Sequence, residues 1–99
     1  MNYRFHRAAL AEHLGEVAFY EDRLPGLGAD YLAEFEKVMT RVCATPELYP
    51  RVGALVVRKA RLERFPFHVI YHVAQAQIFI VAIAHQRRRP AYWVGRIGK

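Results

Sequence analysis

Side chains suited to cleaving a phosphodiester bond occur in the second half of the chain. Attack of a ribose 2′-hydroxyl on its neighbouring phosphate requires a base, cations that stabilise the pentacovalent phosphate, and a donor for the leaving oxygen. His85 could be the base, because the arginines that follow it favour the neutral form of its ring. Arg61 or Arg64 could hold the phosphate, and Tyr92 could donate a proton or stack on a base.

An acidic partner for this base is not obvious in the sequence. Glu63 is the only acidic residue after position 50, and it does not clearly share a face with His85. The same part of the chain fits a second use, contact with a partner without any reaction, since Trp and Arg often dominate interfaces. The candidate contact residues are Arg58, Arg61, Arg64, His85, Arg87, Arg88, Arg89, Tyr92 and Trp93. Catalysis and binding both stay open at this point.

The distribution of charge favours an anionic partner for the second half. The chain has 15 basic and 9 acidic side chains and a net charge of +6. Residues 1–50 carry five basic and eight acidic side chains, whereas residues 51–99 carry ten basic side chains and one acidic side chain. Twelve of the 15 basic residues are Arg, whose planar guanidinium can grip a phosphate or a carboxylate at two points. We therefore expect nucleic acid or an acidic protein segment as the partner.

The sequence predicts no metal site, cofactor or membrane segment. His68 and His72 are four residues apart and share a strand face, but no third ligand lies near them in the sequence. Cys43 is the single cysteine, which excludes an internal disulfide and suits the reducing cytoplasm. No apolar run reaches the roughly 20 residues that cross a bilayer, and the first residues lack the apolar stretch of a secretory signal. We expect a cytoplasmic protein.

Periodicity predicts the elements that must position these residues. Residues 2–6 alternate as a short strand, and helical spacing predicts helices over residues 8–23 and 29–44. Residues 25–28, Pro-Gly-Leu-Gly, separate the helices because neither Pro nor Gly is favourable inside a helix. Thr45-Pro46 ends the second helix, since the residue before a proline avoids the α region.

Amphipathic patterns predict which faces of these helices are buried. The residues expected to face the core are Leu10, Leu14, Val17 and Ala18 in the first helix, and Leu32, Phe35, Met39 and Val42 in the second, flanked by Tyr31 and Val38. The residues expected to face water are Glu12, His13, Glu16, Arg23, Glu34, Lys37 and Arg41.

A period of two predicts a three-stranded meander after the helices. The strands are expected over residues 54–62, 67–73 and 77–84, after a loop over residues 46–53. The nearly unbroken apolar run of the third strand predicts a central strand that is buried on both faces. The order β-α-α-β-β-β predicts one α+β domain over residues 1–99, in which a helical hairpin packs as a second layer on a small, mostly antiparallel sheet.

Several short motifs follow one another along the chain. Phe19-Tyr20-Glu21 lies near the end of the first helix, Gly26-Leu27-Gly28 opens the second, and Thr45-Pro46 begins the next loop. Residues 61–71 contain Arg-x-x-x-Phe-Pro followed by an apolar strand with Tyr, and residues 85–93 read His-x-x-Arg-x-Pro-x-x-Trp. In this combination the chain resembles the RelE/ParE superfamily, the toxins of bacterial type II toxin–antitoxin systems, and residues 85–93 resemble its ParE-like members.

This resemblance implies two alternative activities, and a small basic nucleic-acid-binding module without toxicity is a third hypothesis. ParE-like members inhibit DNA gyrase, and no chemistry by the toxin has to be assumed, whereas RelE-like members cleave messenger RNA on the ribosome. The ParE-like tail implies a gyrase-binding toxin that forms a hetero-oligomer with a cognate antitoxin, whose acidic, amphipathic tail binds the basic half of the chain. The ribosome-dependent ribonuclease is the alternative, with His85, Arg61, Arg64 and Tyr92 as its catalytic residues.

Overall fold

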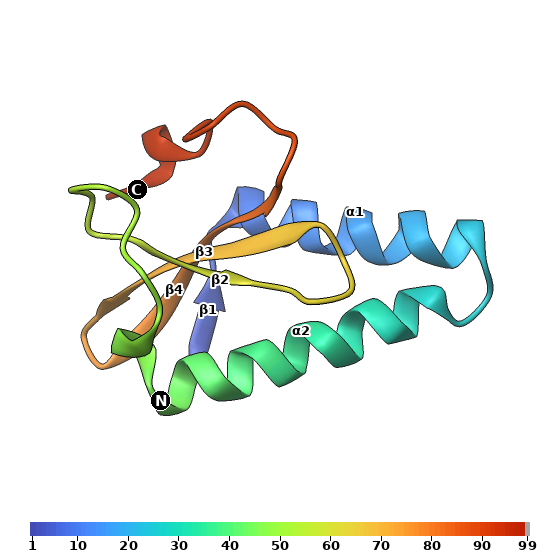
Figure 1. Ribbon diagram of the computed structural model, residues 1–99, viewed down its shortest axis with the longest axis horizontal. Helices are drawn as coiled ribbons and strands as arrows, with labels where there is room; N and C mark the ends of the chain where they lie inside the picture. The colour runs from blue at the N-terminus through green and yellow to red at the C-terminus, as the bar shows by residue number, and fades with distance from the viewer. Residues whose placement is uncertain (99) are drawn as a thin grey trace.

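The chain begins with a strand and a helical hairpin and ends with a meander and an irregular tail (Figure 1). The computed structural model describes residues 1–98. The elements are β1 (Tyr3–Phe5), α1 (Arg7–Arg23), α2 (Leu27–Ala44), β2 (Arg58–Arg61), β3 (Phe67–Ala74) and β4 (Gln77–His85), with short 3-10 turns at Pro46–Leu48 and Val94–Arg96. The predicted order of elements and the α+β class are confirmed.

The last strand, β4, lies inside the sheet, whose strand order is β1-β4-β3-β2. β1 runs parallel to β4, and the other two pairs are antiparallel, so the predictions of a mostly antiparallel sheet and a central β4 are confirmed. β3 and β4 are joined by a tight turn in which Gln75 and Ala76 have φ angles of 53° and 58°. Two positive φ angles are typical of a type I′ hairpin turn, which forms here without its usual Asn or Gly.

Side chains of β4 point into two hydrophobic clusters on the two faces of the sheet, and a bulge at Val81 shifts their alternation. Tyr71 of β3 pairs with Ile80, but the preceding residue, Ile70, pairs with Ala82, so Val81 is an extra residue in β4. The helix-side cluster contains Ala9, Tyr31, Phe35, Val38, Met39, Val42, Ala60, Leu62, Phe65, Phe67, Val69, Tyr71, Ile78, Ile80 and Ile83. The tail-side cluster contains Val57, Ile70, Val81, Ala82, Ala84 and Trp93.

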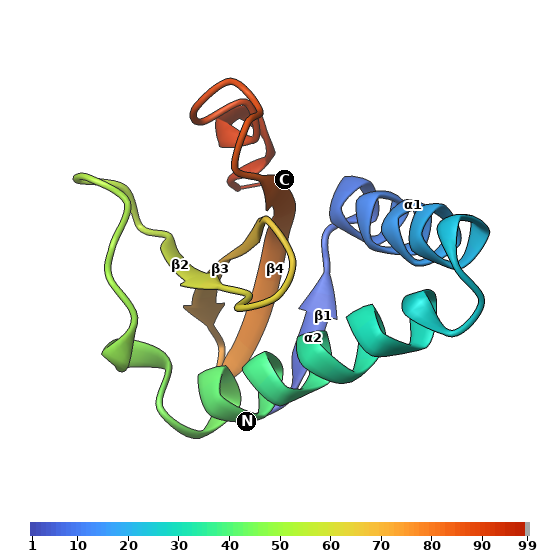
Figure 2. The same cartoon turned by 45° about the vertical axis from the view of Figure 1, so that its right-hand side comes forward.

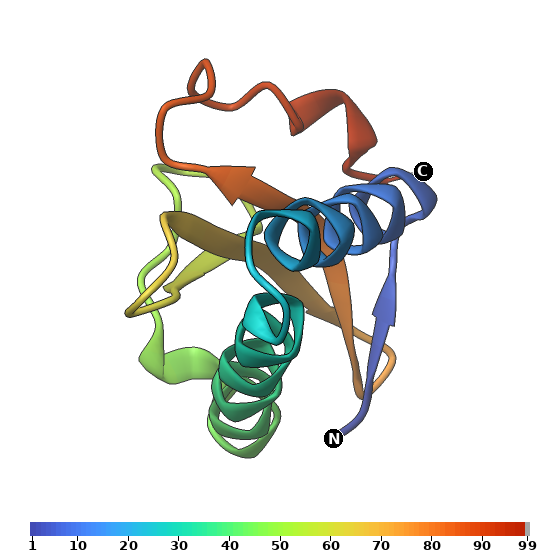
Figure 3. The same cartoon turned by 90° about the vertical axis from the view of Figure 1, so that its right-hand side faces the viewer.

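The helical hairpin and the segment between α2 and β2 lie on opposite sides of the sheet (Figure 2). The helical hairpin covers one face, while the segment between α2 and β2 lies on the far side and the tail lies over the end of β4 (Figures 1 and 2). Figure 3 views the helices nearly end-on and shows the tail running back over the start of α1. The sheet therefore buries apolar side chains on both faces, as predicted for β4.

The buried face of α1 differs from the predicted one. Leu10 and Leu14 are exposed, Leu14 by 57%, whereas His13 is only 6% exposed. The His13 ring lies 4.3 Å from the Phe35 ring and its Nδ1 atom lies 3.1 Å from the Tyr31 hydroxyl. The prediction failed because α1 carries apolar residues on more than one face, so its spacing fixes no single stripe.

The prediction for α2 is largely confirmed. Phe35, Met39 and Val42 are buried, but Leu32 is exposed, and Glu34, which was expected to face water, is 9% exposed. The carboxylate of Glu34 accepts a hydrogen bond of 2.8 Å from the backbone N–H of Arg64, and a buried acid is tolerated when it is paired in this way. The side chain therefore ties α2 to the turn between β2 and β3.

The hairpin between the helices is tighter than the Pro-Gly pattern predicts. α2 begins at Leu27, because the Glu21 carboxylate accepts hydrogen bonds from the backbone N–H groups of Gly26 and Gly28. A Cβ atom on Gly28 would lie 2.8 Å from the carbonyl oxygen of Val17, so only glycine permits this approach of the helices.

The first strand of the meander is shorter than expected. β2 begins at Arg58 rather than near residue 54, and the residues before it form turns. In the described part of the chain, no helix is long and apolar enough to cross a membrane.

Candidate functional site

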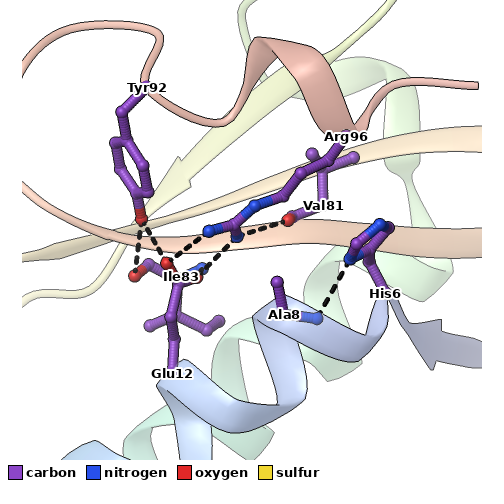
Figure 4. Close-up of polar contacts among 7 residues, drawn as sticks. All are labelled: His6, Ala8, Glu12, Val81, Ile83, Tyr92 and Arg96. Carbon is purple, nitrogen blue, oxygen red and sulfur yellow. Dashed lines mark hydrogen bonds and ion pairs between the residues drawn. The ribbon is translucent and has the colours of Figure 1, made fainter. Parts of the chain in front are cut away.

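A carboxylate on α1 holds the C-terminal tail against β4 (Figure 4). Oε1 of Glu12 accepts hydrogen bonds from the Ile83 backbone N–H at 3.0 Å and from Nη1 of Arg96 at 2.9 Å. Oε2 of Glu12 accepts hydrogen bonds from the Tyr92 hydroxyl at 2.7 Å and from Nη2 of Arg96 at 2.9 Å. We call Glu12, Tyr92 and Arg96 the tail clamp.

The position of the tail clamp follows from the unequal lengths of β1 and β4. β1 ends at Phe5, and the next residue, His6, donates the last backbone hydrogen bond on this edge, to Ile80. Beyond that point β4 has no neighbouring strand on this side. Glu12 accepts the free N–H of Ile83, and Nη1 of Arg96 donates to the carbonyl of Val81 at 3.1 Å, so the clamp replaces the missing strand.

Partial burial strengthens the attraction between the opposite charges of the clamp. The side chains of Glu12 and Arg96 are only 18% and 19% exposed. Burial alone would raise the pKa of the Glu12 carboxyl, but the hydrogen bonds from Arg96 and Tyr92 outweigh it and hold that pKa below its ordinary value. Burial, followed by the hydrogen bond to Glu12, raises the pKa of Tyr92. The tail is therefore anchored by an ionised pair and a neutral phenol.

Trp93 supports the tail from beneath. We expected its indole to be a contact surface, but it is only 4% exposed and packs in the tail-side cluster, so this expectation is wrong for the folded chain. The Arg88 guanidinium lies 3.9 Å from the centre of the Tyr92 ring. Such a cation–π contact orders one arginine of the loop on the clamp.

The arginines at positions 87–89 lie on the exposed loop that leaves β4. Nδ1 of His85 accepts a hydrogen bond from the backbone N–H of Arg87 at 3.0 Å, and its ring lies 5.1 Å from the Phe67 ring at an interplanar angle of 88°. Among residues 1–98, no acidic side chain lies within ion-pair distance of these three arginines. Their charge is available to a partner.

The arginines of the β2–β3 region point in different directions. Register places Arg58 opposite Tyr71 and Arg61 opposite His68, so these arginines lie on opposite faces of the sheet. Arg58 donates from Nη1 to the carbonyl of Tyr49 at 2.7 Å, and Arg64 pairs with Asp30 at 3.8 Å on the helix side. The predicted opposition of Arg58 and Lys59 is confirmed, and Arg61 does share a face with Lys59.

A match to a protein-family model identifies the family of this chain. The model of the ParE toxin of the type II toxin–antitoxin system parDE matches residues 3–90. The chain belongs to the ParE toxin family. Its fold is similar to that of a chain in the chromosomal ParDE toxin–antitoxin system from P. aeruginosa, with a TM-score of 0.73 and 20% sequence identity over 86% of this chain and 95% of that chain. A search of curated proteins finds no match.

The family match stops short of the tail clamp in this ParE-family toxin. Tyr92, Trp93 and Arg96 follow the matched residues, whereas Glu12, their partner on α1, lies within them. Sequence reasoning missed Glu12 and Arg96, because the residues that form this contact are 84 positions apart. The residue spacing along the chain carries no signal for it.

The proposed nuclease residues are not joined in this ParE-family structure. Arg64 pairs with Asp30, the hydroxyl of Tyr92 bonds to Glu12, and Arg61 lies on the opposite side of the sheet from Arg64. His85 has one acid near it that the sequence did not suggest, Glu16 of α1. Burial raises the pKa of the Glu16 carboxyl, and the proximity of His85 partly opposes that rise.

His68 is a second histidine that lies beside cationic side chains. Burial, followed by the charges of Lys59 and Arg61, lowers the pKa of His68. Cross-strand pairing accounts for this contact, since His68 lies opposite Arg61. In the described residues, no group of three His, Cys, Asp or Glu side chains is arranged to hold a metal ion.

Proposed function

We propose that this ParE-family toxin inhibits DNA gyrase by binding to it, without chemistry of its own. The observation that carries the proposal is the exposed Arg87–Arg89 loop, which the tail clamp anchors and which has no acidic partner among residues 1–98. Because the tail clamp positions the backbone of this loop, binding costs less backbone entropy than ordering a free loop would, which suits an interface. Such a toxin acts in the cytoplasm, where gyrase works.

The proposed contact surface extends from this loop onto the sheet. The Gln86 N–H donates to the carbonyl of Pro66, and Phe67 lies opposite His85, so the loop starts beside β3. Arg61 lies opposite the next residue of β3, His68. Arg61 and the 87–89 loop therefore lie at the same end of the sheet, whereas Arg58 and Arg64 are held by contacts within the protein.

Ribosome-dependent cleavage of messenger RNA is the second candidate function. The proximity of Glu16 to His85 favours it, because a carboxyl with a raised pKa beside an imidazole can take part in general acid–base catalysis. If His85 were the base, its replacement by Gln would lower the cleavage rate by about 10²–10⁴-fold.

Two reactions with the purified protein separate these functions. Gyrase supercoiling of relaxed plasmid is measured with increasing toxin, and a translation reaction that contains a defined messenger RNA is mapped for cuts. We expect inhibited supercoiling and intact RNA. Uninhibited gyrase together with cuts in phase with the codons, lost in His85→Gln, would assign the ribonuclease function instead.

We also propose that a cognate antitoxin neutralises the toxin through an acidic, amphipathic tail. Charge complementarity supports this partner, since residues 51–99 carry ten basic side chains and one acidic side chain. The Arg61 and 87–89 region would attract the acidic side chains, and the complex would be a hetero-oligomer.

Association kinetics test the antitoxin proposal. Because charge mainly accelerates encounter, higher salt should slow association much more than it speeds dissociation. The toxin is immobilised, and association of the antitoxin is followed at increasing salt for the wild type and for Arg61→Gln/Arg89→Gln. The double variant should associate more slowly and with weaker salt dependence. Salt-independent association, or contact with the acidic helical hairpin alone, would contradict the proposal.

A further inference from the structure

A second cationic region lies along the first half of β4, away from the 87–89 loop. A groove of about 840 Å³ lies between β1, the start of α1 and the tail, and the turn after β3 also lines it. Three arginines and two histidines line the groove: Arg4, Arg7, Arg96, His6 and His72. No Asp or Glu lines it. The residues of this groove belong neither to the motifs that carry the family resemblance nor to the proposed gyrase contact.

The side chain of Arg4 lies at one end of a row of side chains that crosses three strands. Register places Phe79 opposite Arg4 on one side and opposite His72 on the other. The Arg4 guanidinium lies 6.0 Å from the centre of the Phe79 ring, and the rings of Phe79 and His72 stack at 5.6 Å with an interplanar angle of 17°. The exposed guanidinium of Arg4 therefore lies beside an aromatic surface, at the outer limit of a cation–π contact.

Two of the three arginines that line the groove, Arg4 and Arg7, have no acidic partner in the described part of the chain, whereas Arg96 is paired with Glu12. Nδ1 of His6 accepts the backbone N–H of Ala8 at 3.0 Å, so a neutral His6 carries its proton on Nε2, which is then a donor (Figure 4). The groove thus combines guanidinium donors with an imidazole N–H and uncompensated positive charge.

The tail supplies the remaining wall. Arg96 is fixed by Glu12 and by the carbonyl of Val81, and its neighbours Gly95 and Gly98 also line the groove. Phe5, Ile80 and Val81 add apolar surface. Small-molecule sites have volumes of about 300–1,000 Å³, apolar walls and a few polar groups, and the groove of about 840 Å³ fits this description.

We propose that this groove binds an organic phosphate of nucleotide size, with the phosphate on Arg4 and Arg7 and the organic part along the apolar wall. One guanidinium group can donate two parallel hydrogen bonds to two oxygens of the same phosphate, which the ammonium group of Lys cannot do. The same chemistry is offered by a free nucleotide and by the 5′-phosphate end of a nucleic acid strand. The groove recognises the phosphate in either case.

Titration of the full-length chain with ATP tests the proposal, with binding measured by calorimetry at low salt. Arg4→Gln/Arg7→Gln should weaken ATP binding by about tenfold or more, because two charge-assisted contacts are lost. The matched control is Arg23→Gln/Arg41→Gln, which removes two exposed arginines and leaves the groove intact. It should bind ATP like the wild type. Arg7→Gln alone should have an intermediate effect, and equal melting temperatures should show that each variant folds.

Further probes identify the source of the phosphate. Pyrophosphate should bind and adenosine should not. Tighter binding of a 5′-phosphorylated oligonucleotide than of ATP, lost when its phosphate is removed, would assign the strand end, and the reverse order would assign the free nucleotide. Absence of ATP binding by the wild type, equal weakening in both double variants, or binding of polyglutamate in place of every phosphate probe would overturn the proposal.

Discussion

The two faces of the sheet are stabilised in different ways. The helix-side cluster buries fifteen residues, which include side chains from both helices and from every strand that follows them. The tail-side cluster buries six, and the segment that covers it is tied down by a single carboxylate, Glu12. Apolar area therefore stabilises the first face, whereas a polar clamp positions the second.

The two faces are expected to respond differently when the protein is destabilised. A large apolar interface forms with the whole domain and is lost with it. A short tail with a small cluster can detach while the rest of the domain stays folded, because local opening needs less free energy than global unfolding. The proposed gyrase contacts therefore depend on the tail clamp for their position.

The largest expected effect is on the helix side. Phe35 is fully buried and contacts the rings of Tyr3, Phe5 and His13. Phe35→Ala should lower the free energy of unfolding by about 3–5 kcal/mol, and Ile80→Ala by about 2–5 kcal/mol. Denaturant titration followed by far-UV circular dichroism measures both. Unchanged stability of both variants would contradict the packing of the hairpin on the sheet.

A smaller and local effect is expected on the tail side. Glu12→Gln removes one charge from the clamp, which should destabilise the docked tail by about 1–3 kcal/mol. Trp93 is the only tryptophan and is buried, so its emission should shift to the red as the tail detaches, before the helices melt. Glu47→Gln, which alters an exposed acid, is the matched control. A single transition in which fluorescence and circular dichroism coincide would show that the tail does not detach separately.

Acid should weaken the two faces in sequence. Burial lowers the pKa of His13 below its ordinary value of 6.5, with Glu36 partly opposing, so the unfolded chain binds more protons and stability falls as pH drops below 6.5. The pKa of Glu12 is lowered from 4.5, so its contribution is present above that value and is lost as pH falls through the folded-state pKa. Melting temperature should therefore decline before the Trp93 emission changes.

A histidine variant sharpens this order. His13→Gln keeps a hydrogen-bonding group near the Tyr31 hydroxyl but cannot titrate, so it should flatten the decline of melting temperature between neutral and mildly acidic pH. His68, whose pKa is also lowered, contributes in the same direction. If the melting temperature of His13→Gln declined with pH as in the wild type, and that of His68→Gln did not, the acid sensitivity would arise from His68 on the other face of the sheet.

Sequence periodicity predicted the parts of the fold that depend on local pattern. The order of elements, the central position of β4 and the buried stripe of α2 at Phe35, Met39 and Val42 are confirmed. The buried face of α1 was wrong, because a helix with apolar residues on several faces is oriented by its neighbours. His13 is buried by the rings of Phe5 and Phe35, which approach it from other elements.

The candidate site was less predictable for a related reason. The motifs drew attention to Arg61 and to residues 85–93, but the contacts that position them come from residues far away in sequence. Glu12 binds the tail because α1 crosses beside the unpaired part of β4, and this crossing cannot be read from spacing. The burial of Trp93 has the same origin, since the tail-side cluster joins β3, β4 and the segment before β2.

Gyrase inhibition by loop variants is the most direct test of the proposed function. Supercoiling is measured with wild-type protein, with Arg87→Ala/Arg89→Ala, and with Arg23→Ala/Arg41→Ala, which removes two exposed arginines from the helical hairpin. The wild type and the hairpin variant should inhibit equally. Inhibition to the same extent by the loop variant should require at least about tenfold more protein, because interface arginines carry much of the binding energy. Equal inhibition by the loop variant, or no inhibition by the wild type, would contradict the account.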